Sequence, residues 1–264
     1  MSIVGQVDSL WRYPVKSMRG EELEEAFVGF SGVYGDRLFA FTSSARPKGF
    51  PYLTGREQRE MLLYRPRFRH PDKAAKPPNL AEAEALAPGL NPMFAAPVDL
   101  AVEVETPSGE VLGVDDPALI RMLVARMGDG HALTLVRSER AMTDCRPVSL
   151  FSIQTARQLG DEIGTTLDKR RFRANIYMNL GSAAGFSEDR FVGQTLRLGP
   201  KVVISILERD PRCKMITLDP DTAEPSGAIL RKVSRAHDGM AGVYGAVLLE
   251  GTVRQGDDIE LLAD

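Results

Sequence analysis

Short runs in which apolar and polar residues alternate constrain this chain most, because a two-residue period places every second side chain on one face of a β-strand. The runs predicted as strands are residues 3–10, 22–30, 37–42, 61–68, 98–106, 110–114, 132–136, 149–151, 174–179, 194–198, 202–207, 243–249 and 258–262. Turn signals separate neighbouring runs, as at Pro107-Ser108-Gly109 and Gly199-Pro200. Many short strands with few helices favour a β-barrel or a β-sandwich over a doubly wound parallel sheet.

Few segments have the pattern of a helix. Asp115-Asp116-Pro117 is a helix start and predicts a helix through about Met127, which marks a boundary in the chain. Ser152 is a second start signal, for a helix that ends near Gly160 or Gly164. The stretch 66–97 is rich in proline and predicts a long connection with one or two helical turns in its Ala-Glu repeat.

Composition excludes several classes of protein. With 33 basic and 36 acidic residues and a net charge of -3, the chain has no overall field to attract nucleic acid or an anionic membrane. Residues 1–20 have no signal-peptide pattern, and no later stretch reaches the roughly 20 apolar residues of a membrane span. We therefore expect a cytoplasmic protein with neither a membrane nor a nucleic-acid partner.

The two cysteines suit free thiols in a reducing compartment. Iron–sulfur clusters usually take four thiolates, so Cys145 and Cys213 alone cannot hold one. If the chain catalyses a redox reaction, its electrons must come from elsewhere.

Cys213 is the strongest candidate for chemistry. It follows Arg212 and precedes Lys214, at the start of a strand-like run over residues 215–218. Flanking positive charge favours the thiolate, the form that attacks electrophiles and binds soft metals. A small hydrophobic role at a strand edge explains the segment equally well on its own. The polar turn Asp219-Pro220-Asp221-Thr222 follows, and its plain interpretation is the end of a strand.

Several short segments offer cationic donors for an oxyanion such as phosphate. They are Arg170-Arg171-Phe172-Arg173-Ala174-Asn175, the loop Tyr13-Pro14-Val15-Lys16-Ser17-Met18, Gly35-Asp36-Arg37 and Thr54-Gly55-Arg56. Forked guanidinium donors suit such anions. A solvated basic face is the alternative for the first segment, and a nucleic-acid contact ranks lower because aromatic residues do not interleave with it as a stacking platform.

Other familiar sites have no support. The three histidines, His70, His131 and His237, are far apart in the sequence and lack metal-ligand spacing. The chain has no Gly-x-x-x-x-Gly-Lys-Ser/Thr loop and no Gly-x-Gly-x-x-Gly after a strand. One soft ligand and several arginines remain.

These segments, in this order, resemble the MOSC proteins. The likeness is to the branch with an N-terminal MOSC-associated β-barrel domain, which includes the mitochondrial amidoxime-reducing component. The segments that carry it are residues 13–18, 35–37, 54–56, Arg146 to Ser152, Phe172 to Asn175 and Arg212 to Thr222. The resemblance implies a mainly β (α+β) fold, with a β-barrel-like N-terminal domain over residues 1–125 and a MOSC β-barrel domain with a few helices over residues 126–264.

The resemblance also implies a molybdenum cofactor, a molybdopterin carrying molybdenum, with Cys213 as the metal ligand. The positions that match residues around the cofactor's phosphate and pterin are Lys16, Ser17, Arg37, Arg56, Ser152, Arg173 and Asn175. Asp219 and Asp221 are the carboxylates available near the metal for handling protons, which with Cys213 makes them the candidate catalytic residues. In this class, small N-oxygenated compounds are reduced by two electrons and lose oxygen as water.

Some features depart from these relatives. Some of the relatives carry a fused C-terminal ferredoxin domain, whereas this chain continues only briefly after its last predicted strand. We therefore expect a separate electron donor of the ferredoxin or flavin reductase type. The anchoring segment of the mitochondrial relatives is not seen, and Met215 and Ile216 stand where those enzymes have more polar residues. The alternative function is a carrier of sulfur, as a persulfide, or of molybdenum cofactor, acting through Cys213.

Overall fold

The computed structural model describes residues 2–47, 49–127 and 131–262. The chain forms two compact units. The first, here the barrel unit, contains Met1–Arg12, Gly20–Val33 and Thr143–Asp264, and the second, here the ribbon unit, contains Tyr13–Arg19 and Tyr34–Met142. These units cross the predicted division at residues 125 and 126, because the N-terminal strand folds with the C-terminal half of the chain.

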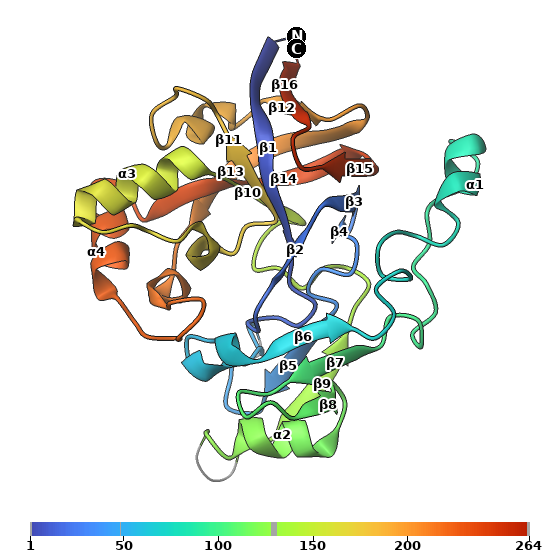
Figure 1. Cartoon of the computed structure of the whole chain (residues 1–264), viewed down its shortest axis with the longest axis vertical. Helices are drawn as coiled ribbons and strands as arrows, with labels where there is room; N and C mark the ends of the chain where they lie inside the picture. The colour runs from blue at the N-terminus through green and yellow to red at the C-terminus, as the bar shows by residue number, and fades with distance from the viewer. Residues whose placement is uncertain (1, 48, 128–130, 263–264) are drawn as a thin grey trace. The chain divides into compact units, whose positions relative to one another are not determined.

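The barrel unit is built on a closed sheet of seven strands, in the order β11–β10–β14–β13–β12–β16–β1, with β2 added beside β1 (Figure 1). Its strands are β1 (Ser2–Arg12), β2 (Glu21–Leu23), β10 (Val148–Ser152), β11 (Ile176–Asn179), β12 (Thr195–Leu198), β13 (Val202–Pro211), β14 (Met240–Leu249) and β16 (Asp258–Leu262). Pairing of β1 with β11 closes the sheet. Neighbouring strands are antiparallel except for β10 and β11, which are parallel. The mainly β fold class is thus confirmed, and the architecture is a barrel rather than a sandwich.

The predicted alternation places the barrel core. Along β13, Val202, Ile204 and Ile206 are fully buried, whereas Val203 and Ser205 between them are only partly buried. The inward residues join a single apolar cluster with residues of β1, β10, β11, β12, β14 and β16. Each large aliphatic side chain buried in this way stabilises the fold by about 1.5–3 kcal/mol relative to an exposed one.

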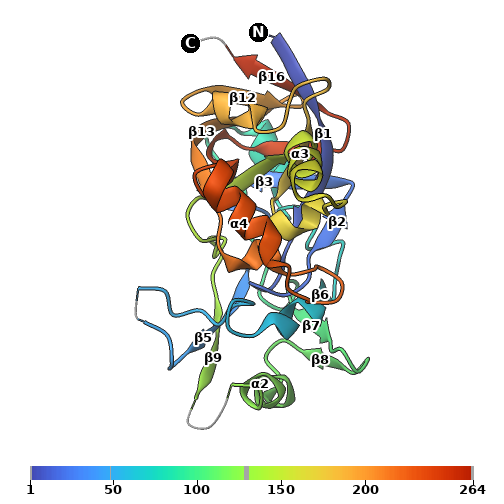
Figure 2. The same cartoon turned by 90° about the vertical axis from the view of Figure 1, so that its left-hand side faces the viewer.

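Helices and a small sheet complete the barrel unit. The sheet contains β3 (Glu25–Gly29), β4 (Gly32–Val33) and β15 (Gly251–Arg254), and the helices are α3 (Ile153–Ile163), α4 (Gly227–Ala236) and the 3-10 helices η2 (Lys169–Phe172), η3 (Ser187–Phe191) and η4 (Lys214–Thr217). The predicted start and end of α3 are confirmed: the Ser152 hydroxyl accepts a hydrogen bond from the backbone of Thr155, and Gly164 ends the helix at φ 71°. Helix α4 was not predicted; it packs beside α3 (Figure 2).

The ribbon unit has two small sheets. One is the antiparallel pair β5 (Phe39–Ser43) and β9 (Leu133–Arg137), and the other contains β6 (Arg65–Phe68), β7 (Val102–Glu105) and β8 (Val111–Gly113). Its helices are η1 (Arg59–Leu63), α1 (Leu80–Ala85) and α2 (Pro117–Val124). The Asp116 cap of α2 is confirmed, whereas the predicted strand 61–68 begins as η1 and continues as strand β6 from Arg65.

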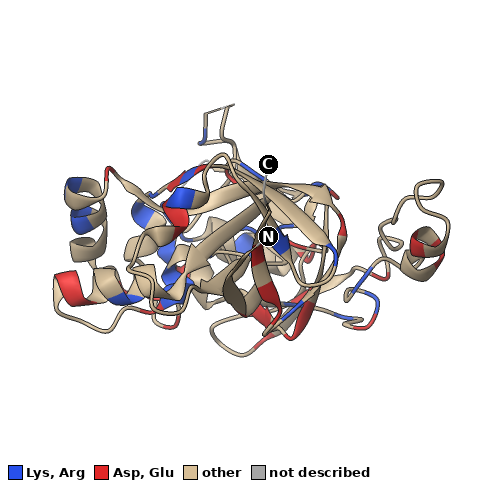
Figure 3. Cartoon of the chain, turned by 90° about the horizontal axis from the view of Figure 1, so that it is seen from above, with Lys and Arg blue, Asp and Glu red and all other residues tan. Residues whose placement is uncertain are grey.

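Charge is spread over the chain. Basic and acidic residues are interspersed along the whole chain (Figure 3), and their numbers nearly balance, with a net charge of -3. Within residues 2–47, 49–127 and 131–262, no helix is long and apolar enough to cross a membrane.

Candidate functional site

Cys213 stands directly before η4, with its thiol half-buried and not in a disulfide. The prediction of a strand at 215–218 was wrong, because this segment folds as a 3-10 turn. The Ile216 N–H donates to the Cys213 carbonyl at 3.3 Å, and the Thr217 hydroxyl donates to the Lys214 carbonyl at 2.8 Å. These local bonds satisfy groups that a strand would need to pair with a neighbour.

The two cations beside Cys213 differ in their surroundings. Lys214 is exposed, whereas the Arg212 side chain is only 7% exposed and lies 2.8 Å from the buried carboxylate of Asp210. The Arg212 guanidinium also donates to the carbonyls of Ala241, at 2.6 Å, and Phe172, at 2.9 Å. Asp210 therefore offsets the charge of Arg212, and this arginine anchors the backbone next to Cys213.

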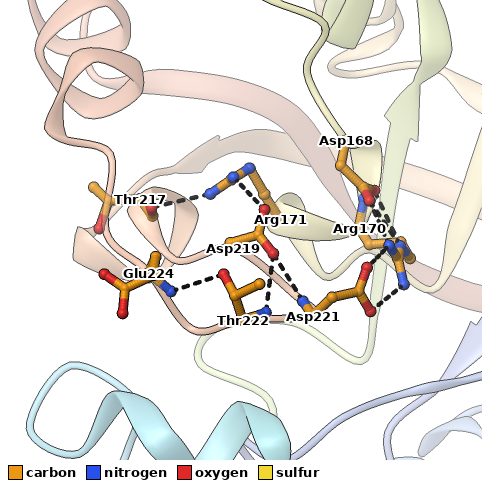
Figure 4. Close-up of polar contacts among 8 residues, drawn as sticks. All are labelled: Asp168, Arg170, Arg171, Thr217, Asp219, Asp221, Thr222 and Glu224. Atoms are coloured by element: carbon orange, nitrogen blue, oxygen red, sulfur yellow. Dashed lines mark hydrogen bonds and ion pairs between the residues drawn. The ribbon is translucent and has the colours of Figure 1, made fainter.

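Asp219 and Asp221 are tied to the arginines of η2 (Figure 4). Asp219 accepts from the Arg171 guanidinium at 2.7 Å and from the backbone N–H groups of Asp221 and Thr222, each at 3.0 Å. Burial raises the pKa of Asp219, but the two N–H groups and the charge of Arg171 outweigh it and hold that pKa below its ordinary value. The carboxylate is thereby kept ionised.

The second pair in Figure 4 is closer to solvent. Arg170 contacts Asp221 at 2.5 and 3.2 Å and also binds both carboxylate oxygens of Asp168. These hydrogen bonds hold the pKa of Arg170 above its ordinary value. The Asp221 side chain is 49% exposed, so the pair contributes little to stability.

Ser152 is completely buried at the start of α3. Its hydroxyl contacts the carboxylate of Glu188 at 2.8 Å and the hydroxyl of Thr155 at 3.0 Å. Glu188 is itself fully buried and also accepts from the Thr155 hydroxyl at 2.7 and 2.8 Å. The group predicted to line a cofactor is engaged in a helix cap and a buried hydrogen-bond network.

Asn175 is likewise buried and has internal partners. Its side chain is fully buried; the carbonyl oxygen accepts from Ser149, and the amide nitrogen donates to the Trp11 carbonyl at 3.3 Å. Asn175 therefore joins strands β1, β10 and the start of β11.

Three predicted cofactor-binding residues have a left-handed backbone. Their φ values are 67° at Ser17, 45° at Arg37 and 53° at Arg173. Within the described ranges, only Phe186, Ala223 and Asp238 share a positive φ among residues other than glycine. Such backbone conformations are costly outside glycine and concentrate at functional sites.

The ribbon unit holds a group of cations on aromatic rings. The Lys16 ammonium lies 5.5 Å from the centre of the Phe50 ring, and the Arg56 guanidinium lies 4.5 Å from the same ring. Lys16 also donates to the Met142 carbonyl at 2.8 Å, and Arg56 donates to the Thr54 hydroxyl at 3.1 Å. Phe50 thus links two predicted anion-binding side chains.

Arg37 belongs to the same unit. Its guanidinium lies 2.5 Å from the buried carboxylate of Asp36 and 4.6 Å from the centre of the Tyr13 ring. The Tyr13 N–H donates to that carboxylate at 2.8 Å, so the Tyr13–Met18 loop and Arg37 are fixed to each other.

The predicted site residues divide between the two units. The barrel unit contains Ser152, Arg173, Asn175, Cys213, Asp219 and Asp221, and the ribbon unit contains Lys16, Ser17, Arg37 and Arg56. The sequence interpretation missed the buried pair of Asp210 and Arg212, although alternation at the end of a strand places residues two apart on one face. No group of three or more His, Cys, Asp or Glu side chains in the described part of the chain is arranged to hold a metal ion.

Comparison with known families identifies the two parts of the chain. Residues 4–87 match the MOSC N-terminal beta barrel domain, and residues 137–260 match the MOSC domain. The two matches together span most of the sequence, and the chain belongs to the proteins that combine these domains. MOSC domains are of the kind found at the C-terminus of molybdenum cofactor sulfurases, and the family is associated with binding of that cofactor in general.

Three solved structures that match are distant in sequence. The YuaD protein from Bacillus subtilis is 13% identical, with 97% of this chain and 94% of that chain covered and a TM-score of 0.47. YiiM from Geobacillus stearothermophilus and YiiM from Escherichia coli are each 16% identical, with 45% of this chain and 55% of theirs covered and TM-scores of 0.34 and 0.33. No curated protein matches the chain.

Proposed function

We propose that this chain binds molybdopterin-bound molybdenum through Cys213 and reduces small N-oxygenated compounds, using electrons from a separate donor protein of the ferredoxin or flavin reductase type. One observation carries the proposal: a half-buried thiol outside any disulfide stands at the start of η4 within the residues that match the MOSC domain. A thiolate is the soft ligand that such a metal prefers.

The donor set fits this group in part. Each unit by itself contains cationic donors of the kind that suit a phosphate: Arg173 in the barrel unit, and Lys16, Arg37 and Arg56 in the ribbon unit. Ser17, which has a left-handed backbone, follows Lys16. Ser152 and Asn175 fit less well as direct contacts, because both are fully buried and their polar groups have internal partners. We assign these two residues to the framework that carries the site.

The chain's own residues would bind the metal, anchor the segment around it and provide charge beside it. When bound, the cofactor supplies two-electron transfer at the metal. The Cys213 thiolate is the protein ligand, and the segment around it is fixed by Arg212 from the preceding position. Asp219 has a lowered pKa and stays ionised, so its carboxylate suits electrostatic support of Arg171 better than proton donation.

Metal content tests the proposal. Protein produced in a host that makes molybdenum cofactor should contain near-stoichiometric molybdenum by elemental analysis, and Cys213→Ala should lose it. Cys145→Ala is the matched control and should keep the metal. Wild-type protein without molybdenum or pterin fluorescence from such a host contradicts the proposal, as does full metal retention in Cys213→Ala. Loaded protein should reduce an N-hydroxylated model compound with a chemical electron donor.

A sulfur carrier is the second candidate, favoured by the half-buried thiol of Cys213 beside the exposed Lys214. Intact mass after incubation with a cysteine desulfurase and cysteine separates the two functions. One added sulfur on Cys213 in a protein that never acquires molybdenum supports the carrier. We also propose a cytoplasmic location, because both cysteines are free and a reducing compartment preserves them.

A further inference from the structure

Three consecutive residues, Arg171, Phe172 and Arg173, connect two candidate cofactor contacts of the barrel unit. These contacts are Cys213 and Arg173 itself. Arg171 and Phe172 end η2, and Arg173 follows with its left-handed backbone. Helices η2 and η4 pack against each other. The segment that presents Arg173 therefore borders the segment that begins with Cys213.

Arg171 holds the far end of η4. Its guanidinium donates to the Thr217 carbonyl at 3.0 Å and to the Asp219 carboxylate at 2.7 Å (Figure 4). The turn from Thr217 back to Cys213 is closed by the Thr217 hydroxyl on the Lys214 carbonyl and by the Ile216 N–H on the Cys213 carbonyl. One guanidinium thus fixes both the last residue of η4 and the turn that follows.

Phe172 holds the other side of Cys213. Its carbonyl accepts from the Arg212 guanidinium at 2.9 Å, and its ring stacks on Phe151 with centroids 4.0 Å apart. The chain is therefore fixed to residues 171–173 both before and after Cys213. All of these groups are buried or half-buried, where a charge-assisted hydrogen bond is strong.

We propose that residues 171–173 form a mount that sets the place of Cys213 relative to Arg173, with Arg171 as its positioning residue. This inference rests on the proposed function, in which Cys213 binds the metal and Arg173 binds an anionic part of the same cofactor. The mount gives Asp219 a role through Arg171, in place of direct proton transfer.

Thiol accessibility in cofactor-free protein tests the mount. In a Cys145→Ser background, the rate of alkylation of Cys213 by iodoacetamide is measured by peptide mass spectrometry. Arg171→Gln should raise this rate at least about fivefold, because it removes the guanidinium bonds to Thr217 and Asp219 and each internal hydrogen bond is worth roughly that factor in a local opening equilibrium. Arg171→Lys keeps the charge and one bond, and should restore most of the wild-type rate.

The matched control is Arg197→Gln. Arg197 contacts Glu260 at 2.6 Å between β12 and β16, in an ion pair that is also partly buried and belongs to the same unit. This variant should leave the alkylation rate unchanged. Asp219→Asn is a second, isosteric probe if Arg171→Gln does not fold, and it should raise the rate in the same direction. The double variant should then add little to Arg171→Gln, since that change already removes the contact between Arg171 and Asp219.

An unchanged alkylation rate in both Arg171→Gln and Asp219→Asn overturns the mount, as does an equal increase in Arg197→Gln. Molybdenum retention after dialysis gives a second readout and should fall in Arg171→Gln but not in Arg197→Gln. Failure of the proposed function can be distinguished from failure of the mount. If the proposed function is wrong, wild-type protein lacks molybdenum, and the alkylation comparison still decides whether the mount exists.

Discussion

The guanidinium of Arg212 lies 2.8 Å from the carboxylate of Asp210, and the two side chains are 7% and 2% exposed. Removing two charges from water is costly unless they stay together and their remaining hydrogen-bonding groups find partners. The carbonyls of Ala241 and Phe172 meet that need for Arg212. The residue next to Cys213 is therefore part of the rigid barrel framework.

Replacing Arg212 alone should be strongly destabilising. Arg212→Gln leaves the Asp210 charge buried without its partner, and we expect the free energy of unfolding to fall by about 3–5 kcal/mol. Urea denaturation followed by circular dichroism measures this change. The double variant Asp210→Asn/Arg212→Gln removes both charges and should recover much of the loss; a single variant as stable as the wild type would contradict this account.

Asp219 should make stability depend on pH in the acid range. Its folded pKa lies below the ordinary value, so its contribution to stability is fully present above the unfolded pKa of about 3.9 and is lost as the pH falls through the folded pKa. The difference in unfolding free energy between wild type and Asp219→Asn should be largest near neutral pH and shrink below about pH 4. Urea titrations at several pH values check the trend, and a difference independent of pH would count against it.

Cys145 should react slowly for an exposed thiol. Burial of the sulfur, followed by the nearby charges of Asp144, Asp210 and Glu208, raises its pKa, so less thiolate is present at neutral pH. Asp144→Asn should lower that pKa and speed iodoacetamide labelling of Cys145. The comparison is made in a Cys213→Ser background, with Asp161→Asn on α3 as the control. Equal labelling rates in Asp144→Asn and wild type would be the contrary result.

Ser152→Ala should weaken the barrel unit while leaving cofactor content unchanged. The variant removes the cap of α3, worth about 1 kcal/mol, and one hydrogen bond to buried Glu188, for a further loss of about 1–3 kcal/mol. Thermal unfolding measures the loss of stability, and elemental analysis measures the molybdenum content. Stable Ser152→Ala protein that loses molybdenum would restore the direct cofactor contact that the sequence predicts.

Local features of the fold could be predicted because their causes are local. The alternation along β13 and the cap residues Ser152, Gly164 and Asp116 each act on their own few neighbours. The 3-10 turn at Lys214–Thr217 could not be predicted in this way, because its apolar run also suits a strand. Helix α4 was missed although a signal was present, because its buried residues Ile229 and Val233 are four positions apart, as on one face of a helix.

The sequence by itself determined that the chain has many short strands, that it belongs to this family and that Cys213 is its candidate reactive thiol, because side-chain periodicity and motif order are properties of neighbouring residues. Only the tertiary structure decided that β1 closes the barrel by pairing with β11 and β16, since such pairing joins residues far apart in the chain. It also decided that Arg212 faces Asp210, that Ser152 and Asn175 are internal, and that Arg171 reaches η4. Burial and distance set these roles, and neither can be read from residue type alone.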